Sequence, residues 1–84
     1  MDDRGERHRE AAKRHEEAAT RHEQAAGRHA EAAAHWREVG DEEHAELEER
    51  HAQWERDGAR LEREAVQLER DSADYWDRNE RQER

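Results

Sequence analysis

The sequence predicts an all-α protein, an antiparallel helical hairpin of two long helices with a turn near Gly40. Three observations support this fold class. A seven-residue pattern occurs four times between His8 and Ala33, proline is absent from the 84 residues, and Gly40-Asp41 interrupts the periodic pattern near the middle of the chain. A period of seven is typical of helices that pack along one stripe, and proline is the strongest helix breaker.

The first helix is expected at about residues 6–38 and is built on the repeated pattern. Each repeat starts with a histidine, and an alanine pair follows three and four residues later. These three places lie on one face of an α-helix, so we expect that face to be covered by the rest of the chain. We call the four histidines the histidine row: His8, His15, His22 and His29.

The turn is placed at residues 39–41. A glycine just past a helix end is a common C-terminal cap, and Asp41 followed by two glutamates is typical of the start of a new helix. A continuous helix with a one-residue skip is the competing interpretation. We expect the second helix at about 42–80, frayed ends that include residues 1–5, and a single domain over 1–84.

The second helix carries three rows with a spacing of seven. The small row is His44, His51, Gly58, Ala65 and Ser72; the large row is Leu47, Trp54, Leu61, Leu68 and Tyr75; the alanine row is Ala45, Ala52, Ala59, Val66 and Ala73. The large row and the alanine row form two apolar edges, which predict that the helix packs against more than one neighbour.

A chain that folds back at Gly40 brings residues equidistant from it face to face. This places His29 opposite His51, His22 opposite Gly58, and Trp36 opposite His44. The large row then meets the alanine pairs of the first helix, with Ala33 facing Leu47, Ala26 facing Trp54, Ala19 facing Leu61 and Ala12 facing Leu68. Large side chains against small ones favour dense packing.

The composition indicates that a single hairpin has a small hydrophobic core and low stability. Charged residues make up 49% of the chain and hydrophobic residues only 30%. Burying one large apolar side chain contributes roughly 1.5–3 kcal/mol, whereas ordering one residue of backbone costs about 1–2 kcal/mol. We therefore expect a homo-oligomer, a dimer of hairpins that forms a four-helix bundle or coiled coil. A different protein partner is also compatible with this composition.

Other features narrow the class of function. The net charge of −9 disfavours nucleic-acid binding, and the chain has no cysteine. The sequence lacks an apolar run that would span a membrane and an apolar leader, so we expect a cytoplasmic protein without membrane contact. Thr20 and Ser72 lie in no nucleophile motif, and no enzyme is expected.

Histidines inside a bundle predict metal binding. Residues seven apart are separated by about 10.5 Å along a helix, too far to share one ion. A site must therefore form between helices, and the expected ligands are His29 and His51, followed by His22 and His44. Imidazole ligands suit zinc, copper or nickel. The specific prediction is a non-enzymatic bundle with a histidine-lined interior that binds one of these metals.

Three alternatives remain open. The first is a structural oligomerisation or protein-interaction coiled coil, in which the histidines only fill space and no metal binds. The second is haem bound by two histidines, because Gly58 opposite His22 would leave room for a flat group. The third is a disordered chain of the desiccation type, which the regular heptads disfavour.

Overall fold

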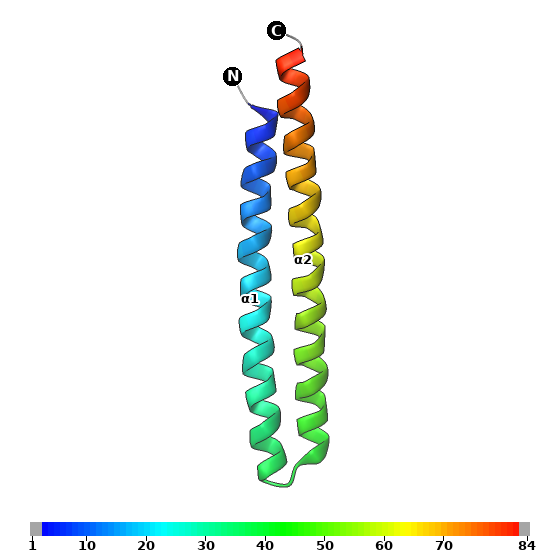
Figure 1. Cartoon of the computed structure of the whole chain (residues 1–84). Helices are drawn as coiled ribbons and strands as arrows, with labels where there is room; N and C mark the ends of the chain where they lie inside the picture. The colour runs from blue at the N-terminus through cyan, green and yellow to red at the C-terminus, as the bar shows by residue number, and fades with distance from the viewer. Residues whose placement is uncertain (1–2, 83–84) are drawn as a thin grey trace.

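The computed structural model describes residues 3–82, which form two antiparallel helices, α1 (Arg4–Glu38) and α2 (Glu42–Gln82). The two helices lie side by side along their length, with both ends of the chain at the same end of the molecule (Figure 1). The rod measures 68 × 16 × 11 Å. The predicted all-α hairpin is confirmed. Arg4 and Gly5, expected to be frayed, belong to α1, and the expected fraying of residues 1–2 and 83–84 lies outside the described residues.

The turn has the hydrogen bonds of a Schellman cap. Gly40 has a φ of +87°, in the left-handed region that favours glycine. Its N–H donates to the carbonyl of Arg37, and the N–H of Asp41 donates to the carbonyl of Trp36 at 2.8 Å. Asp41 also caps α2, since its side chain accepts from the N–H of His44 at 3.0 Å. One short segment ends one helix and begins the next, so the continuous-helix interpretation is wrong.

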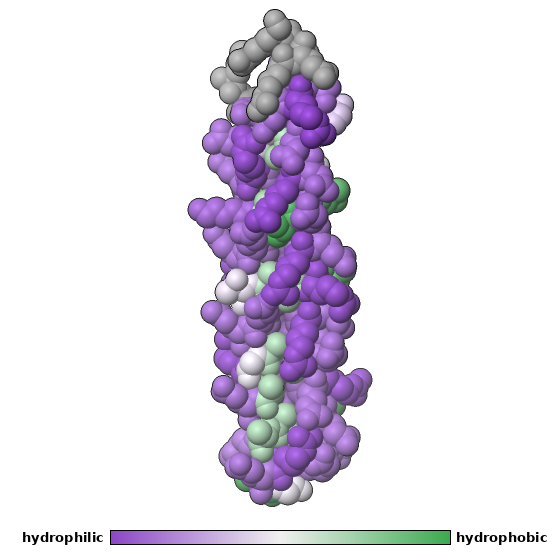
Figure 2. Space-filling view, in the orientation of Figure 1, coloured by the Kyte–Doolittle hydropathy of each residue, from purple (hydrophilic) through white to green (hydrophobic). Residues whose placement is uncertain are grey.

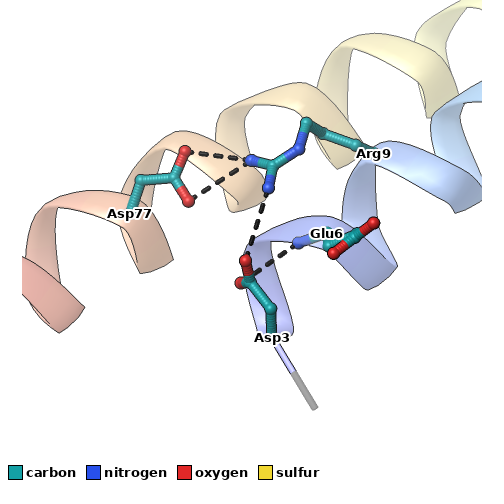
Figure 3. Close-up of polar contacts among 4 residues, drawn as sticks. All are labelled: Asp3, Glu6, Arg9 and Asp77. Carbon is teal, nitrogen blue, oxygen red and sulfur yellow. Dashed lines mark hydrogen bonds and ion pairs between the residues drawn. The ribbon is translucent and has the colours of Figure 1, made fainter. Parts of the chain in front are cut away.

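The open end of the hairpin is held by a polar cluster (Figure 3). The side chain of Asp3 caps α1 by accepting from the N–H of Glu6. Arg9 donates to Asp77 of α2 at 3.0 Å and lies 3.6 Å from Asp3. A Cβ added to Gly5 would lie 2.4 Å from the Asp77 carboxylate, so glycine allows this close approach. The first turn of α1 is thus attached to the last turns of α2.

Small residues from both helices form the core. Alanine at the second place of each alanine pair is buried from α1, and the alanine row is buried from α2. The core residues are Ala12, Ala19, Ala26, Ala33, Ala45, Ala52, Ala59, Val66 and Ala73. Because alanine side chains extend by one methyl group, the helix backbones approach closely.

The prediction that the large row faces the alanine pairs is wrong. Leu47, Trp54, Leu61 and Leu68 are exposed by 47%, 71%, 59% and 65%, respectively. Residues two apart on a helix point about 160° away from each other, so burying the alanine row turns the large row outward. The hairpin therefore uses one of the two apolar edges of α2 and leaves the other on its surface.

The fold-back alignment itself is confirmed by three contacts. The rings of His29 and His51 stack with centroids 5.0 Å apart, and those of Trp36 and His44 stack at 4.1 Å. A Cβ added to Gly58 would lie 3.2 Å from the ring of His22. The histidine row of α1 and the position of the turn were thus sufficient to predict which residue of the small row lies opposite each histidine.

Two helix-interior glycines give a matched test of this packing. A Cβ at Gly27 would meet no atom within 4 Å, whereas one at Gly58 would press on His22. Alanine is favoured over glycine in a helix by about 1 kcal/mol. We expect Gly27→Ala to raise the free energy of unfolding by about that amount in urea titrations followed by circular dichroism. Gly58→Ala should gain less or lose stability, and an equal gain from both would argue against the His22–Gly58 contact.

The surface is strongly hydrophilic. In Figure 2 weakly hydrophobic surface appears along the rod towards the turn, and more hydrophobic atoms protrude at the margin on the side of α2. Neither helix, over the part of the chain that the structure describes, is apolar enough along its length to cross a membrane.

Candidate functional site

Each histidine of the histidine row lies against a glutamate of α2. Nδ1 of the histidine and Oε2 of the glutamate are 2.6–2.8 Å apart in all four pairs. Both partners recur every seven residues, so the helices bring them together once per heptad. The pairs are His8–Glu69, His15–Glu62, His22–Glu55 and His29–Glu48.

These contacts fix the chemistry of the imidazoles. An ionised carboxylate only accepts hydrogen bonds, so Nδ1–H is the donor and Nε2 is the nitrogen left for another partner. The histidine side chains are 32–40% exposed. The expected histidine-lined interior is therefore corrected: the histidines border the seam between the helices, and alanines fill it. The close approach of the alanine faces pushes the larger imidazoles to the edge of the seam.

Glu48 is the carboxylate with the most imidazoles around it. It accepts from His29 at 2.7 Å, and Nε2 of His44 lies 3.7 Å from its other oxygen. The ring of His51 stacks against that of His29. The hydrogen bond from His29, supported by the nearby charges of the three histidines, lowers the pKa of Glu48 below its ordinary value.

The four expected metal ligands take three different positions. His29 and His51 come together, but their ring planes are only 19° from parallel. Because the nitrogen lone pairs lie in the ring plane, stacked rings do not direct them at one ion. His44 stacks on Trp36, and His22 lies one heptad away beside Glu55. Among residues 3–82, no three histidine or carboxylate groups are arranged to hold a metal ion.

The space considered for haem is filled. The ring of His22 itself packs over Gly58, with three ring atoms 3.2–3.3 Å from the position of an added Cβ. In the hairpin, glycine at 58 makes room for the imidazole. This explains the small residue opposite His22 without a bound flat group.

The other edge of the seam carries ion pairs. Arg9 pairs with Asp77 and Arg37 with Glu49, while Glu16 pairs with Arg70 and Glu23 with Arg63. Hydrogen bonds to Glu42 and then Glu49 raise the pKa of the Arg37 guanidinium above its ordinary value. Unlike the histidine–glutamate pairs, these pairs change sign along the helix.

This change of sign is specific to one alignment. Sliding the helices by one heptad would keep histidines opposite glutamates, because that pattern repeats. The same slide would bring Arg9 opposite Arg70 in one direction and Arg37 opposite Arg56 in the other. The series of ion pairs is interrupted at one place, where Arg56 lies opposite Ala30 and not an acidic residue. Ala30 and Arg56 both line a hollow of about 330 Å³. A slide in the first direction would still pair Glu16 with Arg63 and Glu23 with Arg56, so the ion pairs support the alignment that the turn imposes but do not set it alone.

The large row is the most hydrophobic exposed feature of the described residues. Tyr75 is 49% exposed, and the other four members are exposed by 47–71%. A surface hollow of about 360 Å³ lies between the first two members and is lined by Leu47, Arg50, His51 and Trp54. Contiguous apolar surface of this kind is typical of interaction sites.

Sequence reasoning missed the glutamate partners of the histidines. Their signal was the spacing of Glu48, Glu55, Glu62 and Glu69, which repeats the period of the histidine row. Comparisons of the chain with protein-family models, curated proteins and solved structures found no match.

Proposed function

We propose that this hairpin is a structural assembly module that associates with itself through the large row of α2. The observation that carries the proposal is the contrast between its two apolar edges. The edge that faces α1 contributes alanine and one valine to the core, whereas all five large side chains of the other edge lie exposed. The largest apolar side chains of α2 are therefore only partly buried in a single hairpin, and further burial would add hydrophobic free energy.

The magnitudes favour burial of this row in an assembly. Each leucine or tryptophan that moves from water into an interface contributes roughly 1.5–3 kcal/mol. The members recur every seven residues and form one continuous stripe along α2, the pattern of a helix that pairs with another helix. Pairing through α2 also provides the second neighbour expected from the two apolar edges and forms a dimer of hairpins with four helices.

Sedimentation equilibrium tests the proposal. We expect the wild-type chain to have the mass of a dimer at micromolar concentration, and Leu61→Glu to weaken association by at least about tenfold because it places a charge in the apolar stripe. Ala34→Glu introduces the same charge at an exposed position of α1 and should leave the mass unchanged. A wild-type monomer at all concentrations, or a Leu61→Glu variant that associates normally, would refute self-association through this row.

A second candidate function, binding of zinc, copper or nickel, is supported by the histidine–glutamate pairs. Histidines that bind metals commonly donate their other ring N–H to a carboxylate, which orients the ring and leaves Nε2 for the ion. His29 has Glu48 as this partner and His22 has Glu55. His44 also lies near Glu48, and His51 stacks on His29. Metal binding requires the stacked rings of His29 and His51 to turn, or ligands from a second copy to complete the site.

Thermal unfolding distinguishes a metal site from a packing role. Chelator-treated protein is melted alone and with one equivalent of each ion. A bound ion is expected to raise the melting temperature, and His29→Ala/His51→Ala should abolish the rise. His8→Ala/His15→Ala removes the same number of imidazoles elsewhere and serves as the control. The metal hypothesis fails if no ion shifts the wild-type melt, or if both double variants lose the shift equally.

A further inference from the structure

We infer that the two copies pair through antiparallel α2 helices in one twofold-symmetric register, with the large row of each copy seated against the small row of the other. This inference rests on the proposed self-association and specifies its geometry. The first observation is the hollow lined by Leu47, Arg50, His51 and Trp54. They occupy positions i, i+3, i+4 and i+7 of the helix. In a coiled coil, four residues with this spacing surround each side chain that inserts from the partner helix.

The same set of four recurs along the outer side of α2. Its third member belongs to the small row and is His51 in the first set, then glycine, alanine and serine. The ring of His22 covers one side of Gly58, so a side chain of a second copy would enter this set beside that ring. The later sets are Trp54/Asp57/Gly58/Leu61, Leu61/Glu64/Ala65/Leu68 and Leu68/Asp71/Ser72/Tyr75. The first set lines a hollow, and the sequence repeats the same spacing three more times along α2.

One antiparallel register fills all four sets from a second copy. Leu68 of the second copy enters the first set, and Leu61, Trp54 and Leu47 of that copy enter the second, third and fourth sets in turn. Each large side chain then lies beside the third member of its set, with Trp54 next to Ala65 and Leu61 next to Gly58. Interdigitation of large with small is the packing that protein interiors require.

A parallel pair of the same helices would pack worse. In register, it would place Ala65 and Ser72 of the small row against their own copies and leave voids, while the large side chains would meet one another. Voids lose dispersion contacts and hydrophobic burial. The alternation of small and large residues therefore favours the antiparallel arrangement.

The charged residues beside the large row also favour the antiparallel arrangement. In the antiparallel register Arg50 lies beside Asp71 of the second copy, and Glu43 lies beside that copy's Arg78. Asp57 meets Glu64, a like-charged pair that lowers affinity near the centre. In a parallel pair in register, Glu43, Asp57 and Glu64 would lie beside Glu48, Glu62 and Glu69 of the second copy, which are like charges, while Arg50 would lie beside Glu55. Complementarity at both ends of this flank supports a second copy as the occupant. The opposite flank brings Glu48 near Glu69 and Glu55 near Glu62, and each of these carboxylates is bonded to a histidine of its own hairpin.

A charge-reversal pair tests the register. Arg50 and Asp71 are about 30 Å apart along one helix, so they meet only between copies. We expect Arg50→Asp to weaken dimerisation about tenfold, because symmetry breaks two ion pairs and creates two repulsions. Arg50→Asp/Asp71→Arg should restore affinity to within about threefold of the wild-type value. If the double variant is no tighter than Arg50→Asp, the register is overturned.

Disulfide trapping gives an independent test, because the chain has no cysteine of its own. Under oxidation Leu47→Cys/Ser72→Cys should form a covalent dimer, while Ser72→Cys alone should not. A covalent dimer of Ser72→Cys alone would indicate parallel pairing, and one of Leu47→Cys/Ala65→Cys in place of Leu47→Cys/Ser72→Cys would indicate a shift of one heptad. Either result overturns the register and leaves self-association standing, whereas a wild-type monomer removes both.

Discussion

Replacing Ala52 with leucine is expected to lower the free energy of unfolding of the hairpin by about 1–3 kcal/mol. Ala52 is 1% exposed and lies in the middle of the alanine row, where α2 packs against α1. A leucine has three more carbon atoms and no space to enter, so the helices must separate or the side chain must adopt a strained rotamer. Thermal melts followed by circular dichroism should show a loss of roughly 4–8 °C for each kcal/mol.

The control for this experiment is Ala34→Leu, which adds the same atoms at an exposed position of α1. Leucine and alanine are both good helix formers, so that variant should melt close to the wild type. Both variants are compared at several protein concentrations, because association through the large row also stabilises the fold. An Ala52→Leu variant as stable as the wild type would show that another face of α2 lies against α1.

Acid is expected to destabilise the hairpin through the His29–Glu48 pair. The hydrogen bond from His29 lowers the pKa of Glu48 from its ordinary value of 4.5, so the folded state favours the carboxylate. A group with a depressed folded pKa contributes stability that is present above its unfolded pKa and is lost as the pH falls through the folded pKa. Protonating Glu48 removes the charge-assisted hydrogen bond that it accepts from His29.

Melting temperature measured between pH 6 and pH 3 checks this prediction. The wild type should be stable at the upper end and lose stability below about pH 4.5. Glu48→Gln should melt lower than the wild type at pH 6 and change less on acidification. Glu31→Gln, which removes an exposed carboxylate of α1, serves as the control and should follow the wild-type curve. Identical pH profiles for Glu48→Gln and the wild type would contradict the role of this pair.

The sequence was sufficient to predict the hairpin and its alignment. The repeated histidine–alanine pattern identifies the inner face of α1, and Gly40 fixes which residues of α2 lie opposite, as the His29–His51 and Trp36–His44 stacks confirm. The facing edge of α2 could not be predicted in the same way. Volume matching favoured the large row, but alanine against alanine gains its stability from close backbone approach, which a pattern of residue sizes does not reveal.

The candidate site was predicted only in part. The histidines were evident because the chain has 7 of them and four share one period. Their glutamate partners were obscured by abundance, since 25 acidic residues produce many rows with a spacing of seven by composition alone. Which of these rows lies beside the histidines depends on the rotation of α2 about its own axis, and that rotation follows from the choice of apolar edge.

The ion pairs at the seam have a consequence for the connection between the helices. In the two outer pairs, Arg9–Asp77 and Arg37–Glu49, the arginine belongs to α1. In the two inner pairs, Glu16–Arg70 and Glu23–Arg63, the arginine belongs to α2, so a different alignment would change which charges face each other. The turn therefore imposes the alignment, and the four ion pairs support it along the helices. Because Gly40 and Asp41 also cap the two helices, a longer linker in place of residues 39–41 would remove these caps and leave the side-chain contacts along the helices to hold the alignment.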